Sequence, residues 1–248
     1  MSRRLIAPLL SATLWLISCR SKPMFNAEEY FDGSARQLAV AIQRNQLDQA
    51  QRLLAGVELN RLYRENMTFI MWAIINQRKQ GLEWLLQHGA KPNYQDADGM
   101  SPVSYAATIN DGDYLKILLK HGGDPNSRDD GQPATIGAAL VDEDLWANVV
   151  YLLDHGADIN ATDKDGDSLV TTYAGLNFFD KVAYLIDRGA DIRYVDQYGG
   201  TLAYMVEKAH PNPGTENYKW QQIVRQKLIG RGIKFPAPRP WGVQGKKG

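Results

Sequence analysis

A six-residue phrase returns along this chain at a nearly constant interval. It reads Leu-Leu-x-x-Gly-Ala, or a close variant, and starts at residues 85, 118, 152 and 185. Its glycines fall at 89, 122, 156 and 189, in steps of 33, 34 and 33 residues. A degenerate copy at 53–56 extends the series upstream. A fixed period of this length indicates a solenoid, in which each unit packs against its neighbours alone.

Turn and cap signals surround the phrase. The clearest unit, residues 96–107, reads Asp-Ala-Asp-Gly-Met-Ser-Pro-Val-Ser-Tyr-Ala-Ala. Its Gly99 suits a turn that needs a positive φ, while Ser101 caps a helix whose first turn holds Pro102. In the first full unit Asn66 replaces the turn glycine, and asparagine tolerates the same backbone region. Each unit is predicted to be a turn followed by two helices, the second ended by the glycine of the phrase.

This consensus resembles the ankyrin repeat, a β-turn followed by two antiparallel helices. The resemblance covers residues 34–233. It implies an all-α ankyrin-repeat solenoid with about four full repeats between N- and C-terminal capping repeats. Residues 35–56 are expected to form the N-terminal helix pair.

The C-terminal end departs from the regular period. The step from Gly189 to Gly232 is longer than the others, and two prolines and a glycine stand at 210–215. These residues predict an inserted loop, followed by a capping helix at 218–228. Residues 234–248 are expected to form a Pro-rich, basic and extended tail.

The first residues carry a targeting signal. Two arginines precede an apolar stretch at 5–17, which is too short to span a bilayer comfortably. Leu16-Ile17-Ser18-Cys19 resembles the bacterial lipobox, which implies a cleaved lipoprotein signal peptide at 1–18, a lipid on Cys19 and a tether at 19–33. The expected location is the periplasm, anchored to the inner or outer membrane. A plain secretory signal with an incidental cysteine, or an uncleaved anchor, are the alternatives.

Composition and motifs argue against several functions. Lys plus Arg and Asp plus Glu number 28 each, so nothing indicates nucleic acid as a partner. No Ser-His-Asp set, phosphate loop or zinc spacing is present, so we expect no enzyme and no cofactor. His88, His121 and His155 recur once per repeat, at a spacing too wide for shared ligation of a metal, and are interpreted as structural. The segment 163–167 has a faint likeness to a calcium loop but lacks its glutamate.

The candidate contact residues lie on the turns and at the ends of the first helices, where ankyrin proteins bind partners. The turn aspartates either form the turns or face a basic partner. An apolar row at the helix ends is either a binding stripe or tucked under the next repeat. Trp72, Tyr105 and Ile136 are assigned to the core. The predicted partner-binding residues are Met67, Asp98, Met100, Ile109, Asp130, Leu140, Lys164, Asp165, Asp167, Leu176 and Tyr198.

A lipid-anchored ankyrin array of this size resembles the immunity proteins to type VI secretion phospholipase effectors. The resemblance implies one protein partner, a secreted phospholipase effector, which is inhibited by occlusion. It also implies a chain that is monomeric when unbound. A periplasmic scaffold or stabilising partner of a resident enzyme such as catalase is the alternative.

Overall fold

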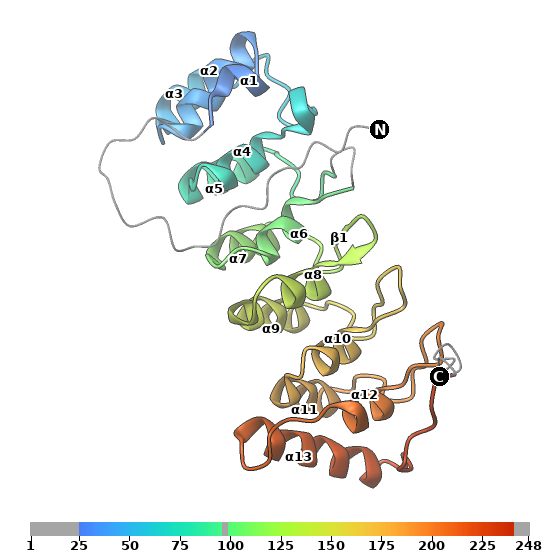
Figure 1. Ribbon diagram of the computed structural model, residues 1–248. Coiled ribbons are helices and arrows are strands. Elements are labelled where there is room, and N and C mark those ends of the chain that lie inside the picture. Colours follow the sequence, from blue (N-terminus) through green and yellow to red (C-terminus); the bar gives the residue numbers. More distant parts are fainter. Residues whose placement is uncertain (1–24, 96–98, 241–248) are drawn as a thin grey trace.

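A stack of helix pairs makes up the molecule (Figure 1). The computed structural model describes residues 25–95 and 99–240. The expected signal peptide with Cys19, and the turn residue Asp98, lie outside the described residues. Successive pairs follow one another along the stack, and the turns that link them project on one side. The expected all-helical solenoid is confirmed.

Each pair consists of an inner and an outer helix. The inner helices are α2 (Gly33–Gln43), α4 (Phe69–Ile75), α6 (Pro102–Ala107), α8 (Ala134–Val141), α10 (Leu169–Gly175) and α12 (Leu202–Lys208). The outer helices are α3 (Leu47–Leu53), α5 (Lys79–Gln87), α7 (Asp113–Lys120), α9 (Trp146–Asp154), α11 (Phe179–Asp187) and α13 (Glu216–Gly230). The short elements are α1 (Ala27–Tyr30), η2 (Arg64–Asn66), η3 (Glu143–Leu145) and the antiparallel strands β1 (Arg128–Asp129) and β2 (Gln132–Pro133).

Local sequence fixes where the helices begin and end. A serine or threonine caps five of the described helices and accepts a hydrogen bond from the amide three residues on. Ser101 and Ser168 each complete a reciprocal capping box. The glycine that follows each regular outer helix has a positive φ, as at Gly89 (93°). Asn66, with φ 58°, adopts the conformation that the sequence predicts for it.

The core lies between the inner and outer helices of each pair. The first leucine of each regular phrase is fully buried, as Leu85 and Leu118 show. Trp72 and Ile136 are fully buried, which confirms their assignment to the core, whereas Tyr105 is half-buried. The indole N–H of Trp72 donates to the carbonyl oxygen of Ala39 at 2.8 Å, so its polar atom is satisfied.

Asparagine side chains join consecutive repeats. The side-chain amide of Asn93 donates to the carbonyl of Gly122 (2.9 Å), and its oxygen accepts from the backbone N–H of Asp124 (2.7 Å). Asn60 and Asn126 make the same two kinds of bond to the next repeat. These bonds satisfy polar backbone groups just beyond the outer helices, which have no partner within the helix.

The N-terminal end is longer than the sequence predicts. Residues 25–33, expected to be part of a tether, contain α1 and pack against the array. The Phe31 side chain is 1% exposed, and its ring lies 4.8 Å from that of Phe69 and 5.4 Å from that of Trp72. The tether prediction is therefore wrong for these residues, because Phe31 covers apolar surface that the first pair would otherwise expose.

The C-terminal end also departs from expectation. The loop at 209–215 lies between α12 and α13, as predicted, but α13 is longer than the expected helix. Phe235 and Ala237 of the predicted extended tail pack against the core. The backbone N–H of Ala237 donates to a carboxylate oxygen of Glu207 at 2.7 Å. The described part of the tail is thus docked on α12 and α13.

No helix in the described ranges combines the length and the apolar character that crossing a bilayer requires.

Replacing Asn93 with alanine is expected to lower the free energy of unfolding by about 1–2 kcal/mol, since two hydrogen bonds between repeats are lost. Urea denaturation followed by circular dichroism measures the change. Asn212→Ala is the matched control: Asn212 is exposed, and its side chain makes no hydrogen bond within the described residues. Equal stability of the two variants would contradict the role assigned to Asn93.

Candidate binding surface

Three apolar side chains are exposed where two neighbouring inner helices end. Leu140 and Val141 close α8 with 56% and 61% of their surface exposed, and Leu176, the C-cap of α10, is 39% exposed. The helices α8 and α10 are packed against each other. We call these three residues the apolar ledge. Exposed apolar groups gathered in this way are typical of interaction sites.

The ledge matches the predicted apolar row in part. Leu140 and Leu176 are exposed, as a binding stripe requires. Ile109 is half-buried and packs against the core, which is the tucked alternative. Val141 is not among the predicted partner-binding residues, although the sequence shows an irregular stretch from Val141 to Leu145. In the sequence, the apolar pair Leu140-Val141 is followed directly by three acidic residues. This pattern indicates a helix end that no neighbouring repeat covers.

An acidic loop follows the ledge directly. Asp142, Glu143 and Asp144 are all exposed. A carboxylate oxygen of Asp142 accepts a hydrogen bond from the backbone N–H of Asp144 at 3.0 Å. Within residues 25–95 and 99–240, none of the three forms an ion pair. Their negative charge is therefore available to a group outside the chain.

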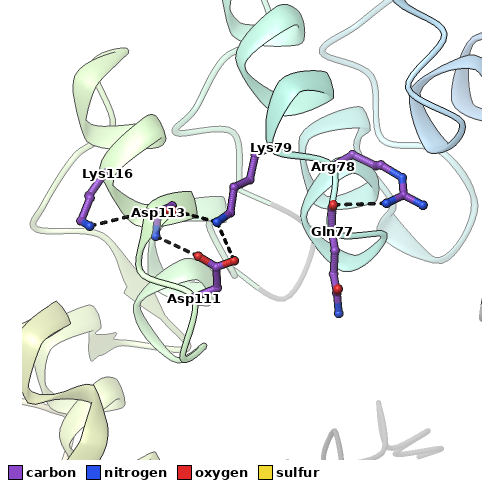
Figure 2. A network of polar contacts seen from close by, with 6 residues as sticks. All are labelled: Gln77, Arg78, Lys79, Asp111, Asp113 and Lys116. Atoms are coloured by element: carbon purple, nitrogen blue, oxygen red, sulfur yellow. Dashed lines mark hydrogen bonds and ion pairs between the residues drawn. The ribbon is translucent and has the colours of Figure 1, made fainter. Parts of the chain in front are cut away.

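The corresponding loop of the preceding repeat is different. There Asp111 and Asp113 meet the ammonium group of Lys79 at 2.8 and 2.7 Å, and Lys116 lies 3.1 Å from Asp113 (Figure 2). Hydrogen bonds from Lys79 and Lys116 hold the pKa of Asp113 below its ordinary value. Hydrogen bonds to the two aspartates raise the pKa of Lys79. This network neutralises its acids within the array, which sets the unpaired loop at 142–144 apart.

The turn aspartates serve mainly to build the turns. A carboxylate oxygen of Asp163 accepts from the backbone N–H groups of Asp165 and Asp167, each at 2.9 Å. Asp130 and Lys164 are both exposed and pair across neighbouring turns at 3.3 Å. Asp165 is exposed as well. The predicted contact residues Asp130, Lys164 and Asp165 are thus accessible at the tips of the turns.

Several carboxylates lie close together around the turn that contains Asp167. Burial raises the pKa of Asp167, and the neighbouring carboxylates of Asp163, Asp196 and Asp165 raise it further. A hydrogen bond with the Thr171 side chain opposes the increase. A basic partner that bound here would reduce the repulsion between Asp167 and the neighbouring carboxylates.

The three apolar turn residues differ in exposure. Tyr198 is 58% exposed and its ring is accessible. Met67 is half-buried and packs against the core, so it is less accessible than a contact residue at a turn tip would be. Met100 is half-buried beside a hollow of about 80 Å³ that Tyr105 and Thr108 also line. Of the three, Tyr198 is the one freely presented to a partner.

The recurrent histidines have local structural partners. His88 Nδ1 lies 2.7 Å from the carbonyl oxygen of Trp84, and the two rings stack 4.1 Å apart. His155 makes the same pair of contacts with Tyr151. These contacts support the structural interpretation of the sequence. In the part of the chain that the structure describes, no group of three His, Cys, Asp or Glu residues is placed to hold a metal ion.

Comparison with known proteins agrees with this geometry. Residues 38–129 match the family model described as ankyrin repeats in three copies. The ankyrin repeat domain of Bcl-3 superposes with a TM-score of 0.65 over 79% of this chain and 86% of that one, at 22% identity. An ankyrin repeat domain from Acinetobacter baumannii AYE superposes with a TM-score of 0.64 over 80% and 98%, also at 22% identity. The chain therefore has the ankyrin-repeat fold, and its residues 38–129 match the ankyrin family model.

A more similar sequence is Protein PhlB of Serratia liquefaciens. It is 29% identical over 170 residues, which cover 68% of this chain and 75% of PhlB. Ankyrin arrays are protein-interaction scaffolds and are typically not catalytic. The apolar ledge, the acidic loop and the accessible turn tips fit that role, because they offer exposed groups for contact with a partner.

Replacing Asp167 with asparagine is expected to raise the stability of the array more at pH 6 than at pH 3. Because the folded-state pKa of Asp167 lies above its ordinary value, its carboxyl is less costly to fold when protonated. The wild-type chain therefore loses stability, relative to the variant, as the pH rises through that pKa. Urea denaturation at several pH values measures the difference.

The matched control for this measurement is Asp144→Asn, at an exposed carboxylate outside this turn that does not contribute to the pKa of Asp167. We expect 0.5 M NaCl to reduce the effect of Asp167→Asn at pH 6, since salt screens repulsion between exposed carboxylates. A difference between wild type and Asp167→Asn that does not change with pH would contradict the charge-crowding explanation.

Proposed function

We propose that this ankyrin protein is a lipid-anchored periplasmic immunity protein that binds a secreted phospholipase effector and inhibits it by occlusion. The resemblance to such immunity proteins and the Cys19 lipobox support the location and the class of partner. The observation that carries the binding role is the apolar ledge bordered by an acidic loop without internal partners.

The ledge supplies the apolar contacts that binding energy requires. Interface energy is concentrated in a few apolar or aromatic side chains that become fully desolvated. Leu140, Val141 and Leu176 are such groups, held by two helices that the array core fixes in place. A partner side chain seated between the ends of α8 and α10 would remove all three from water. A rigid surface of this kind binds without a large ordering cost.

The acidic loop and the turn tips supply selectivity. Asp142, Glu143 and Asp144 lie next to the ledge in sequence and lack basic partners in the described part of the chain. They favour a partner surface with lysine or arginine beside an apolar anchor, and they disfavour acidic surfaces. Complementary charge also speeds the encounter with a toxin that has just entered the compartment.

A survival assay with the effector tests the proposal as a whole. Cells that lack the gene are expected to die when the phospholipase effector is directed to their periplasm, and the full-length chain is expected to restore growth. The same toxin held in the cytoplasm is the control. Unchanged survival of the deletion strain would refute the immunity role. Loss of a resident enzyme's activity on deletion, without any toxin, would favour the scaffold alternative.

The double variant Leu140→Ser with Leu176→Ser is expected to bind the purified effector about 100-fold more weakly, since each truncated anchor costs on the order of 1–2 kcal/mol. Its thermal stability should change little because both side chains are exposed. Isothermal titration calorimetry measures the affinity.

Ile223→Ser with Ile229→Ser is the matched control, since these exposed isoleucines of α13 (40% and 42%) lie outside the ledge. The control is expected to bind as the wild type does. Equal affinity of the ledge variant and the wild type would refute the ledge as the contact.

A further inference from the structure

The inserted loop of the last repeat lines a cleft. Two hollows, of about 450 and 380 Å³, adjoin the C-terminal end of α12, and Glu207 and His210 line both. The loop at 209–215 and the start of α13 form one wall. The docked tail at 236–239 forms another. We call the two hollows together the C-terminal cleft. Each has the volume of a small-ligand or peptide pocket.

Prolines and tyrosines make up much of the lining. Pro211, Pro213 and Tyr218 line the larger hollow, and Tyr204 and Pro236 line the smaller one. Proline and tyrosine rings are rigid, so they lose little conformational entropy when a partner packs against them. Grooves lined by aromatic side chains are a recurring way of holding an extended, proline-containing peptide.

The cleft carries an excess of positive charge. Lys208, Arg225 and Arg239 line it, and within the described residues none of them forms an ion pair. The Arg225 guanidinium lies 4.7 Å from the centre of the Phe235 ring, a contact that positions the cation without neutralising it. Glu207 supplies the acidic group of the lining, and one of its oxygens already accepts from the Ala237 N–H.

Two lysines on other outer-helix surfaces have acidic partners. Lys120 meets Glu83 at 2.8 Å, and Lys227 meets Asp187 at 2.7 Å. Hydrogen bonds from those lysines lower the pKa of both carboxylates. Unlike these two lysines, the cations of the C-terminal cleft have no acidic partner within the described residues.

We propose that the C-terminal cleft binds an extended acidic segment of a protein, with carboxylates against Arg225 and Arg239 and intervening residues against the proline and tyrosine walls. The arginines suit carboxylates because a guanidinium offers two parallel N–H donors. A peptide fits better than a membrane surface, since the cations line the walls of a hollow and alternate with apolar rings. This site is separate from the apolar ledge and does not depend on the immunity role.

Fluorescence anisotropy with a defined probe tests the proposal. A fluorescein-labelled peptide of four Glu-Pro repeats is expected to bind the full chain saturably and to bind more weakly as salt is added. A labelled peptide of four Lys-Pro repeats is the charge control and is expected not to bind. Equal binding of the two peptides, or no binding of the Glu-Pro peptide, would overturn the proposal.

Two variants locate the binding. Arg225→Ala with Arg239→Ala is expected to weaken binding of the Glu-Pro peptide at least tenfold. Arg239→Glu alone is expected to do nearly the same while the chain melts like the wild type, because Arg239 is an exposed residue of the tail. Arg44→Ala with Arg52→Ala removes two exposed arginines at the other end of the array and is expected to leave binding unchanged.

Full binding by both cleft variants would overturn the assignment, as would equal losses in the control pair. Vesicles of phosphatidylglycerol distinguish the remaining source of negative charge. Binding to such vesicles that depends on Arg225 and Arg239, without binding of the Glu-Pro peptide, would replace the peptide site by a lipid site and refute the proposal as stated. The fate of the ledge variants against the effector is measured separately, so either proposal can fail without the other.

Discussion

The burial of the first leucine of each repeated phrase between helices is the interaction on which the array depends. Leu85, Leu118, Leu152 and Leu185 are fully buried in successive units. A single helix pair has too little apolar surface to hold itself together, so each unit gains stability from its neighbours. Because the leucines face inward, the helix ends and turns are free to vary. The ledge lies at the ends of two inner helices and the cleft lies beside an inserted loop, where the surface can change while the core stays the same.

Sequence predicts the periodic part of this molecule well, since spacing, caps and turn residues are local signals. The capping serines, the helix-ending glycines and the φ of Asn66 follow from them directly. The ends were predicted poorly because they lack the repeated phrase. Nothing in the sequence around Phe31 or Phe235 says which apolar surface is left uncovered, and that surface exists only once the terminal helices are packed.

The candidate site was predictable to a similar degree. Leu140 and Leu176 could be placed by counting from the repeat, but the exposure of Val141 and the burial of Ile109 and Met67 depend on how far each helix extends and on its neighbours. The formal net charge of zero does not show that acidic and basic residues are concentrated in different parts of the array. Acids gather beside the ledge and at the turns, and unpaired cations gather in the C-terminal cleft. A balanced total therefore says little about an array whose repeats can carry opposite charges.

Because residues 25–31 pack against the first repeat, fewer residues are left to link the array to the proposed lipid anchor. The Gln43 side chain holds the carbonyl of Phe25 at 2.9 Å, so the array begins there and not at residue 34. If Cys19 carries the proposed lipid, five residues lie between it and Phe25, and the six Cα-to-Cα steps span at most about 20 Å. That distance is less than the thickness of a bilayer. Such an array would stay in a thin layer of solvent next to the membrane. A lipid-degrading enzyme has to work in the same layer.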